Sequence, residues 1–326
     1  MRIARRLAAA ASLAALAVAG LAGCSTTAAP AADSTQTAVV GDPSKADLTL
    51  TGFDGSETTL AAAPQRIVVL EYAALDTLHT LGLDELVVAT PQKTLPAALA
   101  SFGGEATVDA GTLKEPDLEA IASTDPDLIL VGGRSVDVIP QLQEIAPTVN
   151  VATSSADMIG SAIERAEDLA GLFGLQDEAK AKTEGLQATV DRIAAKANGQ
   201  TALFLLSSGG KLSAYGPGSR YGVLYEQLGF APAAEIAADQ GHGQEVSFEW
   251  VAQANPQWIF ALDRDAAIGQ SGQAAAAVLD NELVNSTEAA KAGHIAMLDG
   301  QSWYLVTGGL TTMQSMLDEV ATAIGA

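Results

Sequence analysis

Residues 115–134 read EPDLEAIASTDPDLILVGGR, and residues 245–264 read EVSFEWVAQANPQWIFALDR. The two stretches align without a gap at an offset of 130 residues and share six identical positions. Each reads as a short helix, an Asp-Pro or Asn-Pro turn, a buried strand and then an arginine. The identities include both ends of the stretch, a glutamate and an arginine. This indicates duplication of a lobe rather than chance recurrence of one supersecondary unit.

Short apolar runs alternate with helical patterns on either side of the repeat. Runs typical of strands occupy residues 66–70, 87–89, 127–131, 148–151, 202–206, 258–262 and 295–298. Strands that alternate with helices predict mainly parallel pairing through crossover connections. The predicted fold class is therefore α/β, with two Rossmann-like lobes joined by a long α-helix.

A helical stripe over residues 155–173 is the candidate for that joining helix, with Ser154 or Ser155 as N-cap and Gly174 as its stop. Its length is roughly 28 Å, enough to cross between lobes. The predicted domains are an N-terminal α/β lobe at 47–153, an interlobe helix at 154–174 and a C-terminal α/β lobe at 175–326. Two lobes joined in this way form a cleft, a favoured place for a small-molecule site.

The first 46 residues read as export and anchoring segments. Basic residues and an uncharged apolar run make residues 1–23 a signal peptide. The run ends in LAGC, which resembles the bacterial lipoprotein signal and predicts lipidation of Cys24; the alternative is an ordinary signal peptide with an accidental cysteine. Residues 24–46 read as a lipidated cysteine and flexible tether. We expect the body at the outer face of the cytoplasmic membrane, held through its lipid anchor alone.

Composition excludes several classes of function. The 326 residues carry 17 Lys+Arg against 39 Asp+Glu, a net charge of −22, which argues against nucleic-acid binding. Hydrophobic residues make up 48% of the chain, which argues against wholesale disorder. A single cysteine excludes an internal disulfide and a cysteine-ligated zinc or iron–sulfur site.

Three arginines are the candidates for ligand binding. Arg134 and Arg264 each lie just beyond the carboxyl end of a predicted strand, where ligands gather in parallel α/β sheets. Arg220 ends the turn GPGSR, which leads into a helix. Guanidinium groups suit an anionic, oxygen-rich ligand. The alternative is local pairing, because Asp263 and Asp265 flank Arg264.

His242 and Tyr304 are candidates for contact with a metal. His242 lies between two glycines just before the second repeat, where a neutral imidazole could bind a metal. Tyr304 follows Trp303 and could supply a phenol oxygen, although such a pair more often packs than ligates. No spacing of His, Asp and Glu predicts a metal cage made by the protein alone.

The chain resembles the substrate-binding lipoproteins of iron-siderophore ABC importers, in the ferric-catecholate branch of the helical-hinge (class III) periplasmic binding proteins. The segments that carry the resemblance are residues 66–83, 111–134, 210–222, 242–269 and 303–309. It implies that Arg134, Arg220 and Arg264 bind the siderophore. It also implies that His242 and Tyr304 complete the coordination of ferric iron, which is cargo and not an intrinsic cofactor, in a monomeric protein.

Glu119 and Glu249 are identical in the two copies of the repeat and lie on its short helices. In the family that the chain resembles, such a pair meets the permease dimer, which works with its own ATPase. Haem or cobalamin binding by the same fold, or a surface enzyme, are the alternative functions. The chain lacks the G-x-S-x-G, H-E-x-x-H and phosphate-loop motifs, which favours a binding protein over an enzyme.

Overall fold

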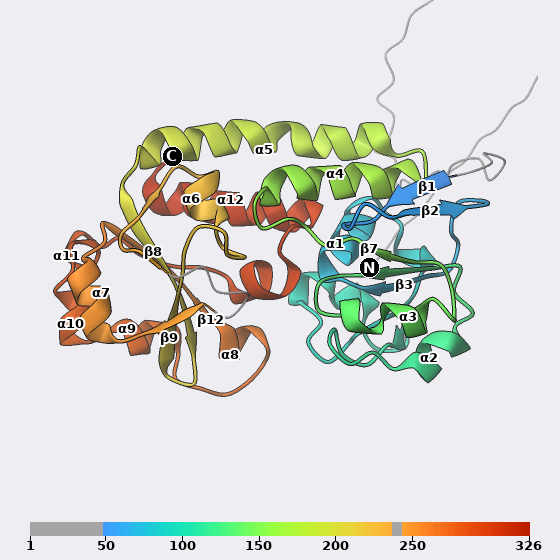
Figure 1. The fold of residues 1–326 in the computed structure, drawn as a ribbon, viewed down its shortest axis with the longest axis horizontal. Coiled ribbons are helices and arrows are strands. Elements are labelled where there is room, and N and C mark those ends of the chain that lie inside the picture. Colours follow the sequence, from blue (N-terminus) through green and yellow to red (C-terminus); the bar gives the residue numbers. More distant parts are fainter. Residues whose placement is uncertain (1–47, 237–242) are drawn as a thin grey trace, which may run out of the picture. The chain divides into compact units, whose positions relative to one another are not determined.

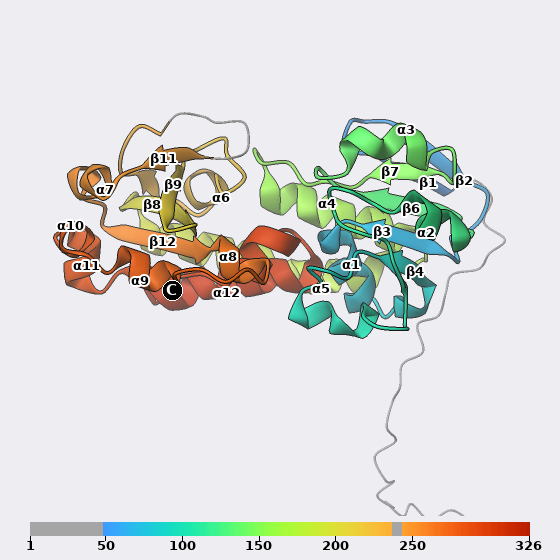
Figure 2. The same ribbon diagram turned by 90° about the horizontal axis from the view of Figure 1, so that it is seen from below.

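The computed structural model describes residues 48–236 and 243–326, which form two α/β lobes with long helices that extend across both (Figures 1 and 2). The predicted α/β class with two lobes is confirmed. The predicted signal peptide, the tether with Cys24, and His242 lie outside the described residues.

The sheet of the first lobe has five parallel strands in the order β5-β4-β3-β6-β7. These strands are β3 (Ile67–Leu70), β4 (Val87–Thr90), β5 (Val108–Asp109), β6 (Leu128–Val131) and β7 (Thr148–Asn150). The two central strands, β3 and β6, are buried throughout, as expected of parallel strands covered on both faces. Strand order reverses between them, so the gap beyond their carboxyl ends is the topological switch point of this sheet.

Helices and a hairpin cover this sheet. The helical segments are α1 (Tyr72–Thr80), α2 (Leu118–Ser123), α3 (Ile139–Leu142) and the 3₁₀ turns η1 (Asp84–Leu86), η2 (Ala97–Phe102) and η3 (Val136–Val138). An antiparallel hairpin of β1 (Leu48–Thr51) and β2 (Glu57–Leu60) precedes them. The sequence pattern did not predict this hairpin, whose strands are short and only partly buried.

The sheet of the second lobe is mixed, with the order β11-β9-β8-β12-β13 and β10 paired to the start of β8. Its strands are β8 (Thr201–Ser208), β9 (Lys211–Tyr215), β10 (Ala231–Pro232), β11 (Gln244–Val246), β12 (Trp258–Asp263) and β13 (Ile295–Met297). Strands β8 and β9 form an antiparallel hairpin through Gly209 and Gly210, both with positive φ. The expectation of mainly parallel pairing is therefore incomplete in this lobe.

Short helices connect these strands. They are α6 (Val223–Glu226), α7 (Phe248–Ala254), α8 (Arg264–Ala267), α9 (Ala275–Leu279), α10 (Glu282–Asn285), α11 (Glu288–Ala292) and the π-helical segment η4 (Gln301–Val306). The π segment crosses the space between the two lobes and carries Tyr304 (Figure 1).

The repeat recurs in three dimensions. Helix α2 and strand β6 in the first lobe correspond to α7 and β12 in the second. Asp125 and Asn255, at equivalent positions before the two prolines, both have left-handed backbone, with φ of 47° and 42°. Asp and Asn tolerate this conformation better than other non-glycine residues, which explains the turn that both copies use.

Three helices pack on one another and run along one side of the two lobes, at the top of Figure 1: α4 (Met158–Gly171), α5 (Gln176–Ala197) and α12 (Leu310–Ile324). Each contributes side chains to the main core of both lobes. The first turn of α4 packs in the second lobe and its last turns pack in the first, whereas α5 runs the opposite way. The chain therefore passes into the second lobe along α5.

The structure has a helix, α4, within the span 154–174 where the sequence predicts an interlobe helix. Residues 158–171 do form a helix that spans both cores, but α5 and α12 span them as well. The predicted cap is wrong, because Asp157 caps α4 by accepting from the backbone N–H of Gly160 at 3.0 Å. Ser154 and Ser155 lie in the preceding coil and line a pocket.

Asp76 links α1 of the first lobe to the start of α12 through hydrogen bonds. Its carboxylate accepts from the backbone N–H groups of Thr311 and Thr312, at 2.9 and 3.2 Å. Helix α12 begins after Gly309, which has no side chain to cap it, so α1 supplies the capping group. Burial raises the pKa of Asp76, and the two hydrogen bonds oppose that shift.

Replacing Asp76 by alanine is expected to lower the free energy of unfolding by about 1–2 kcal/mol, the usual effect of removing an N-cap. Urea denaturation followed by circular dichroism would measure it. Asp318→Ala, which removes an exposed carboxylate from α12 itself, is the matched control and should change the value by less than about 0.5 kcal/mol. Equal midpoints for Asp76→Ala and the natural chain would contradict the capping role.

Candidate functional site

Three arginines converge on Tyr304. Arg134, beyond the end of β6, donates to the backbone oxygens of Tyr304 and of Leu305. Arg220, in the turn after β9, donates to the same Tyr304 oxygen at 2.9 Å. Arg264, which follows β12, donates from Nε to the Tyr304 hydroxyl at 3.0 Å. The structure thus brings together four side chains that the sequence singled out from both lobes.

The guanidinium groups also lie over the Tyr304 ring, with centroid distances of 5.7 Å for Arg134, 4.9 Å for Arg220 and 5.5 Å for Arg264. Such distances permit cation–π attraction. The ring therefore offsets part of the repulsion among three like charges. Tyr304 therefore lies at the centre of the arginine cluster.

A cavity of about 680 Å³ opens beside this cluster. Its lining residues are Lys114, Gly133, Arg134, Asp137, Leu206, Ser208, Ser213, Tyr215, Arg220, Arg264 and Tyr304. Four of these residues are cationic and one is anionic, so the cavity is positively charged in a chain whose net charge is −22. Guanidinium and hydroxyl groups of this kind bind an anionic ligand that is rich in oxygen.

Arg264 keeps its place in the cavity although it has acidic neighbours. Asp265 lies 3.5 Å from Arg264, and the Ser208 hydroxyl lies 3.3 Å from it. Asp263 instead caps α8 by accepting from the backbone N–H of Ala266. The hydrogen bond to Tyr304 raises the pKa of Arg264. Local pairing, the alternative left open by the sequence, is thus partial, and Arg264 also lines the cavity.

Tyr304 is positioned by its neighbour Trp303, which is fully buried in the core of the second lobe. The indole N–H of Trp303 donates to Glu319 on α12 at 2.8 Å. Burial raises the pKa of Glu319. The bulky anchor at 303 explains why the adjoining tyrosine is held at the cavity wall.

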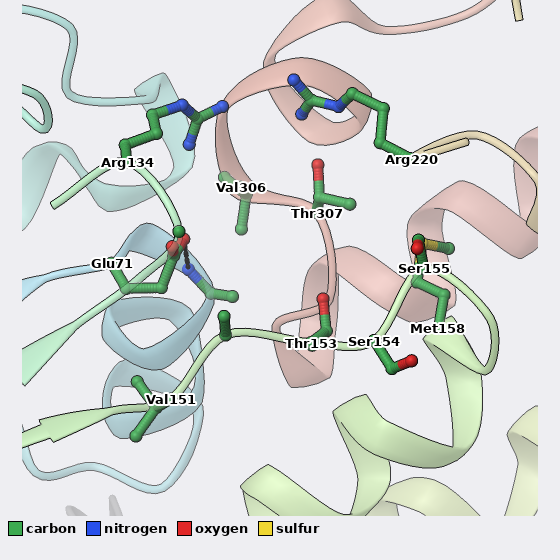
Figure 3. A pocket seen from close by; sticks show the side chains of 13 residues that line it. Glu71, Arg134, Val151, Thr153, Ser154, Ser155, Met158, Arg220, Val306 and Thr307 are labelled. Atoms are coloured by element: carbon green, nitrogen blue, oxygen red, sulfur yellow. Dashed lines mark hydrogen bonds between the residues drawn. The ribbon is translucent and has the colours of Figure 1, made fainter. Parts of the chain in front are cut away.

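A second pocket of about 280 Å³ adjoins the cavity, and we call it the side chamber (Figure 3). Its lining residues are Glu71, Ala73, Gly133, Arg134, Val151, Ala152, Thr153, Ser154, Ser155, Met158, Arg220, Val306 and Thr307. Arg134 and Arg220 belong to both spaces. Figure 3 shows Glu71 and Arg134 on one side, Arg220 on the other, and Thr307 between them.

Glu71, Lys114 and Asp137 are the charged lining residues that the sequence reasoning missed. Glu71 directly follows β3, and in the sequence it reads as an ordinary acidic residue before a helix. Lys114 lies just before the first copy of the repeat, where it reads as one more exposed lysine. The rule that ligands gather beyond the ends of parallel strands could have pointed to Glu71.

Glu119 and Glu249, the predicted docking residues, do not line the cavity. Glu119 and Glu249 lie in the first turns of α2 and α7, and both are exposed. His242 and Cys24 fall outside the described residues. Within residues 48–236 and 243–326, His, Cys, Asp and Glu form no group of three that could hold a metal ion. In these same ranges, no helix has the length and apolar character needed to cross a membrane.

Comparison with known sequences places this chain among binding proteins. A family described as periplasmic binding protein matches residues 67–302. The petrobactin-binding protein YclQ of Bacillus subtilis is 36% identical over 271 residues, which are 82% of this chain and 85% of that protein. The ferric-anguibactin-binding protein FatB of Vibrio anguillarum is 27% identical over 271 residues, which are 81% of this chain and 84% of that protein.

Comparison with solved structures agrees. The crystal structure of YclQ superposes with a TM-score of 0.81 at 34% identity and covers 86% of this chain and 100% of that chain. The periplasmic catecholate-siderophore binding protein VctP of Vibrio cholerae superposes with a TM-score of 0.80 at 30% identity, covering 85% and 99% of the two chains.

Proposed function

Because the chain belongs to the family of periplasmic binding proteins, we propose that it captures a ferric catecholate siderophore in the cavity and delivers it to an ABC permease. This family membership confirms the resemblance drawn from the sequence. The observation that carries the proposal is the convergence of Arg134, Arg220 and Arg264 on Tyr304 beside a cavity of about 680 Å³. A ferric catecholate complex is a large anion rich in oxygen, which matches the charge and the donors of that cavity.

The protein acts in this proposal as a binder and not as an enzyme. Intrinsic tryptophan fluorescence, titrated with ferric catecholates, ferric hydroxamates, haem and cobalamin, tests the ligand class. Sub-micromolar quenching by the catecholates alone is the expected result. Tight binding of haem or cobalamin, or turnover of any ligand, would overturn the proposal.

Iron enters with the siderophore and is cargo, not a resident cofactor. A siderophore with two catecholates leaves two of the six positions on ferric iron open. We place Tyr304 and His242 in these two positions. The hydrogen bond from Arg264 Nε to the Tyr304 hydroxyl supports this role, because a cationic donor stabilises negative charge on the phenol oxygen that hard ferric iron prefers.

The permease would recognise Glu119 and Glu249, one exposed carboxylate on each lobe. Their helices occupy equivalent places in the repeat, α2 in the first lobe and α7 in the second. A pair of carboxylates related in this way suits a permease dimer with one basic site on each subunit, and charge complementarity would set the register of docking. The proposed partner is that dimer with its ATPase, and the binding protein acts as a monomer.

Reversing both charges, with Glu119→Lys and Glu249→Lys, is expected to lower siderophore-dependent iron uptake at least about tenfold. Ligand affinity should stay within about twofold, because neither residue lines the cavity. Uptake of radioactive iron by cells and fluorescence titration of the purified protein measure the two quantities. Reversal of the exposed Glu144 and Glu178 is the matched control. Unchanged uptake with the double Glu119/Glu249 variant would refute this docking site.

The lipid anchor at Cys24 would hold the protein at the outer face of the cytoplasmic membrane. The proposal rests on the LAGC sequence after an uncharged apolar run and on the family membership. Residues 25–46 would then serve as the tether between the anchor and the first lobe.

A further inference from the structure

The side chamber contains a buried carboxylate that the capture of an anionic iron centre does not require. Glu71 lines this chamber and is 8% exposed. The chamber shares Gly133, Arg134 and Arg220 with the main cavity, so one ligand can reach into both. A carboxylate at that depth would repel an anion, which calls for a different explanation.

The backbone places Glu71 at the switch point of the first sheet. Glu71 directly follows β3, and Gly132 directly follows the neighbouring strand β6. A Cβ atom on residue 132 would lie only 1.5 Å from Glu71 Oε2. The carboxylate thus occupies space that glycine alone leaves free, in the crevice where open α/β sheets bind their ligands.

The hydrogen-bonding capacity of Glu71 is mostly unused. A carboxylate accepts about four hydrogen bonds. This one accepts from the backbone N–H of Ala73 at 3.4 Å, a long bond at the start of α1. Within the described ranges, no side chain donates to it and no cation lies within ion-pair distance. Burial raises its pKa, and the charge of Arg134 opposes that shift.

The two nearby arginines form hydrogen bonds with backbone oxygens of η4 and not with Glu71. Arg134 and Arg220 donate to the backbone oxygens of Tyr304 and Leu305. They stand at the border between the chamber and the main cavity, where an anionic ligand centre would attract them. Capping of α1 alone does not explain why residue 71 is a glutamate, because the shorter side chains of Asp, Asn and Ser are the usual N-caps.

Four hydroxyl-bearing residues also line the side chamber, beside the apolar Ala73, Val151, Ala152, Met158 and Val306: they are Thr153, Ser154, Ser155 and Thr307 (Figure 3). Hydroxyls accept hydrogen bonds from a group rich in donors. An apolar group in the chamber would leave the carboxylate without a ligand partner, at a cost in binding free energy. The Thr307 hydroxyl already donates to the backbone oxygen of Trp303 at 2.9 Å and can still accept a hydrogen bond. A protonated amine offers positive charge to Glu71 and several N–H donors to the hydroxyls.

We infer that the side chamber binds the ammonium group of an amine-bearing linker in a ligand whose anionic iron centre occupies the main cavity. This inference rests on the proposed function and narrows its ligand class to catecholates that carry a protonated amine. The arginines at the border face the anionic catecholates on one side. Glu71 faces the ammonium group on the other.

Two synthetic ligands that differ at one atom test the inference. The first joins two catecholamides through bis(3-aminopropyl)amine, and the second joins them through 1,7-diaminoheptane. The chains have equal length, and a CH₂ group in the second replaces the central secondary amine. Their ferric complexes are titrated against the natural chain by tryptophan quenching at pH 7. The amine ligand is expected to bind about tenfold more tightly, as one charge-assisted hydrogen bond would provide.

Glu71→Gln keeps the size of the side chain and a cap acceptor but removes the charge. It is expected to reduce the preference for the amine ligand to within about twofold, with little change for the heptane ligand. Glu144→Gln, which removes an exposed carboxylate of the same lobe, should keep the full preference. Should Glu71→Gln fail to fold, Gly132→Ala displaces the carboxylate instead and should likewise abolish the preference.

The outcomes separate this inference from the function on which it rests. Equal affinity of the natural chain for the two ligands, or a preference that survives in Glu71→Gln, would overturn the inference and leave catecholate capture intact. Failure of both ligands and of other ferric catecholates to bind would overturn the proposed function, and the inference with it.

Discussion

A variant with glutamine at both Arg134 and Arg220 is expected to bind ferric catecholates at least about 100-fold more weakly than the natural chain. Each guanidinium can give an anion charge-assisted hydrogen bonds worth about 1.5–3 kcal/mol, and every 1.4 kcal/mol is a factor of ten in affinity. Both residues line the main cavity and the side chamber, so no position of the ligand avoids them. Titration by tryptophan quenching measures the loss.

Two controls separate charge from structure in this experiment. Arg192→Gln removes a cation from the exposed face of α5 and should leave affinity within about twofold. Arg134 also holds the backbone of Tyr304 and Leu305, so the pair Arg134→Lys and Arg220→Lys tests whether charge alone suffices. The lysine pair should recover part of the affinity, because lysine lacks the fixed fork of donors. A loss below fivefold in the glutamine pair would refute the electrostatic account of the cavity.

Replacing Tyr304 by phenylalanine is expected to abolish the change in the charge-transfer spectrum when a tetradentate ferric bis-catecholate binds. The variant keeps the ring that packs beneath the three arginines and removes the oxygen that accepts from Arg264. Affinity should fall about tenfold, as expected from loss of one coordinated oxygen together with its charged hydrogen bond. Visible absorption spectroscopy records the colour, and fluorescence titration records the affinity.

A hexadentate ferric tris-catecholate provides the matched control for Tyr304→Phe. Its iron has no open position, so the substitution should change neither its spectrum nor, beyond about threefold, its affinity. His242→Ala should repeat the spectral loss with the tetradentate ligand, because the second open position is assigned to that residue. An unchanged spectrum and affinity in both variants would rule out direct ligation of iron by the protein.

The repeat explains why so much of the fold could be predicted from one sequence. Each copy pairs a strong local signal, an apolar strand bounded by Asx-Pro and an arginine, with a counterpart 130 residues away. The structure shows both strands inside their sheets and both arginines at the cavity. Periodicity was weaker for β9, a strand of five residues whose last two are both buried, and for the hairpin at β1 and β2.

The candidate site was only partly accessible from sequence. A positional rule applies to arginines beyond strand ends, so the sequence alone could predict that Arg134 and Arg264 lie beside a cavity. Glu71 follows the same rule, but a lone acid before a helix reads as a cap in a chain with 39 acidic residues. The Glu71 side chain is buried against Gly132 at the end of the neighbouring strand. This contact depends on how the two strands pair, which a local sequence pattern does not show.

The layer formed by α4, α5 and α12 has a consequence for how the protein unfolds. Helix α4 divides its apolar face between the two cores, and α5 and α12 each add one residue, Ala179 and Leu310, to the core of the first lobe, so neither lobe can lose its packing without uncovering apolar surface of this layer. Duplication supplied two similar halves, yet this shared layer makes them one cooperative unit of unfolding. A fragment cut at the boundary between the lobes would expose a long apolar seam to water and would be prone to aggregate.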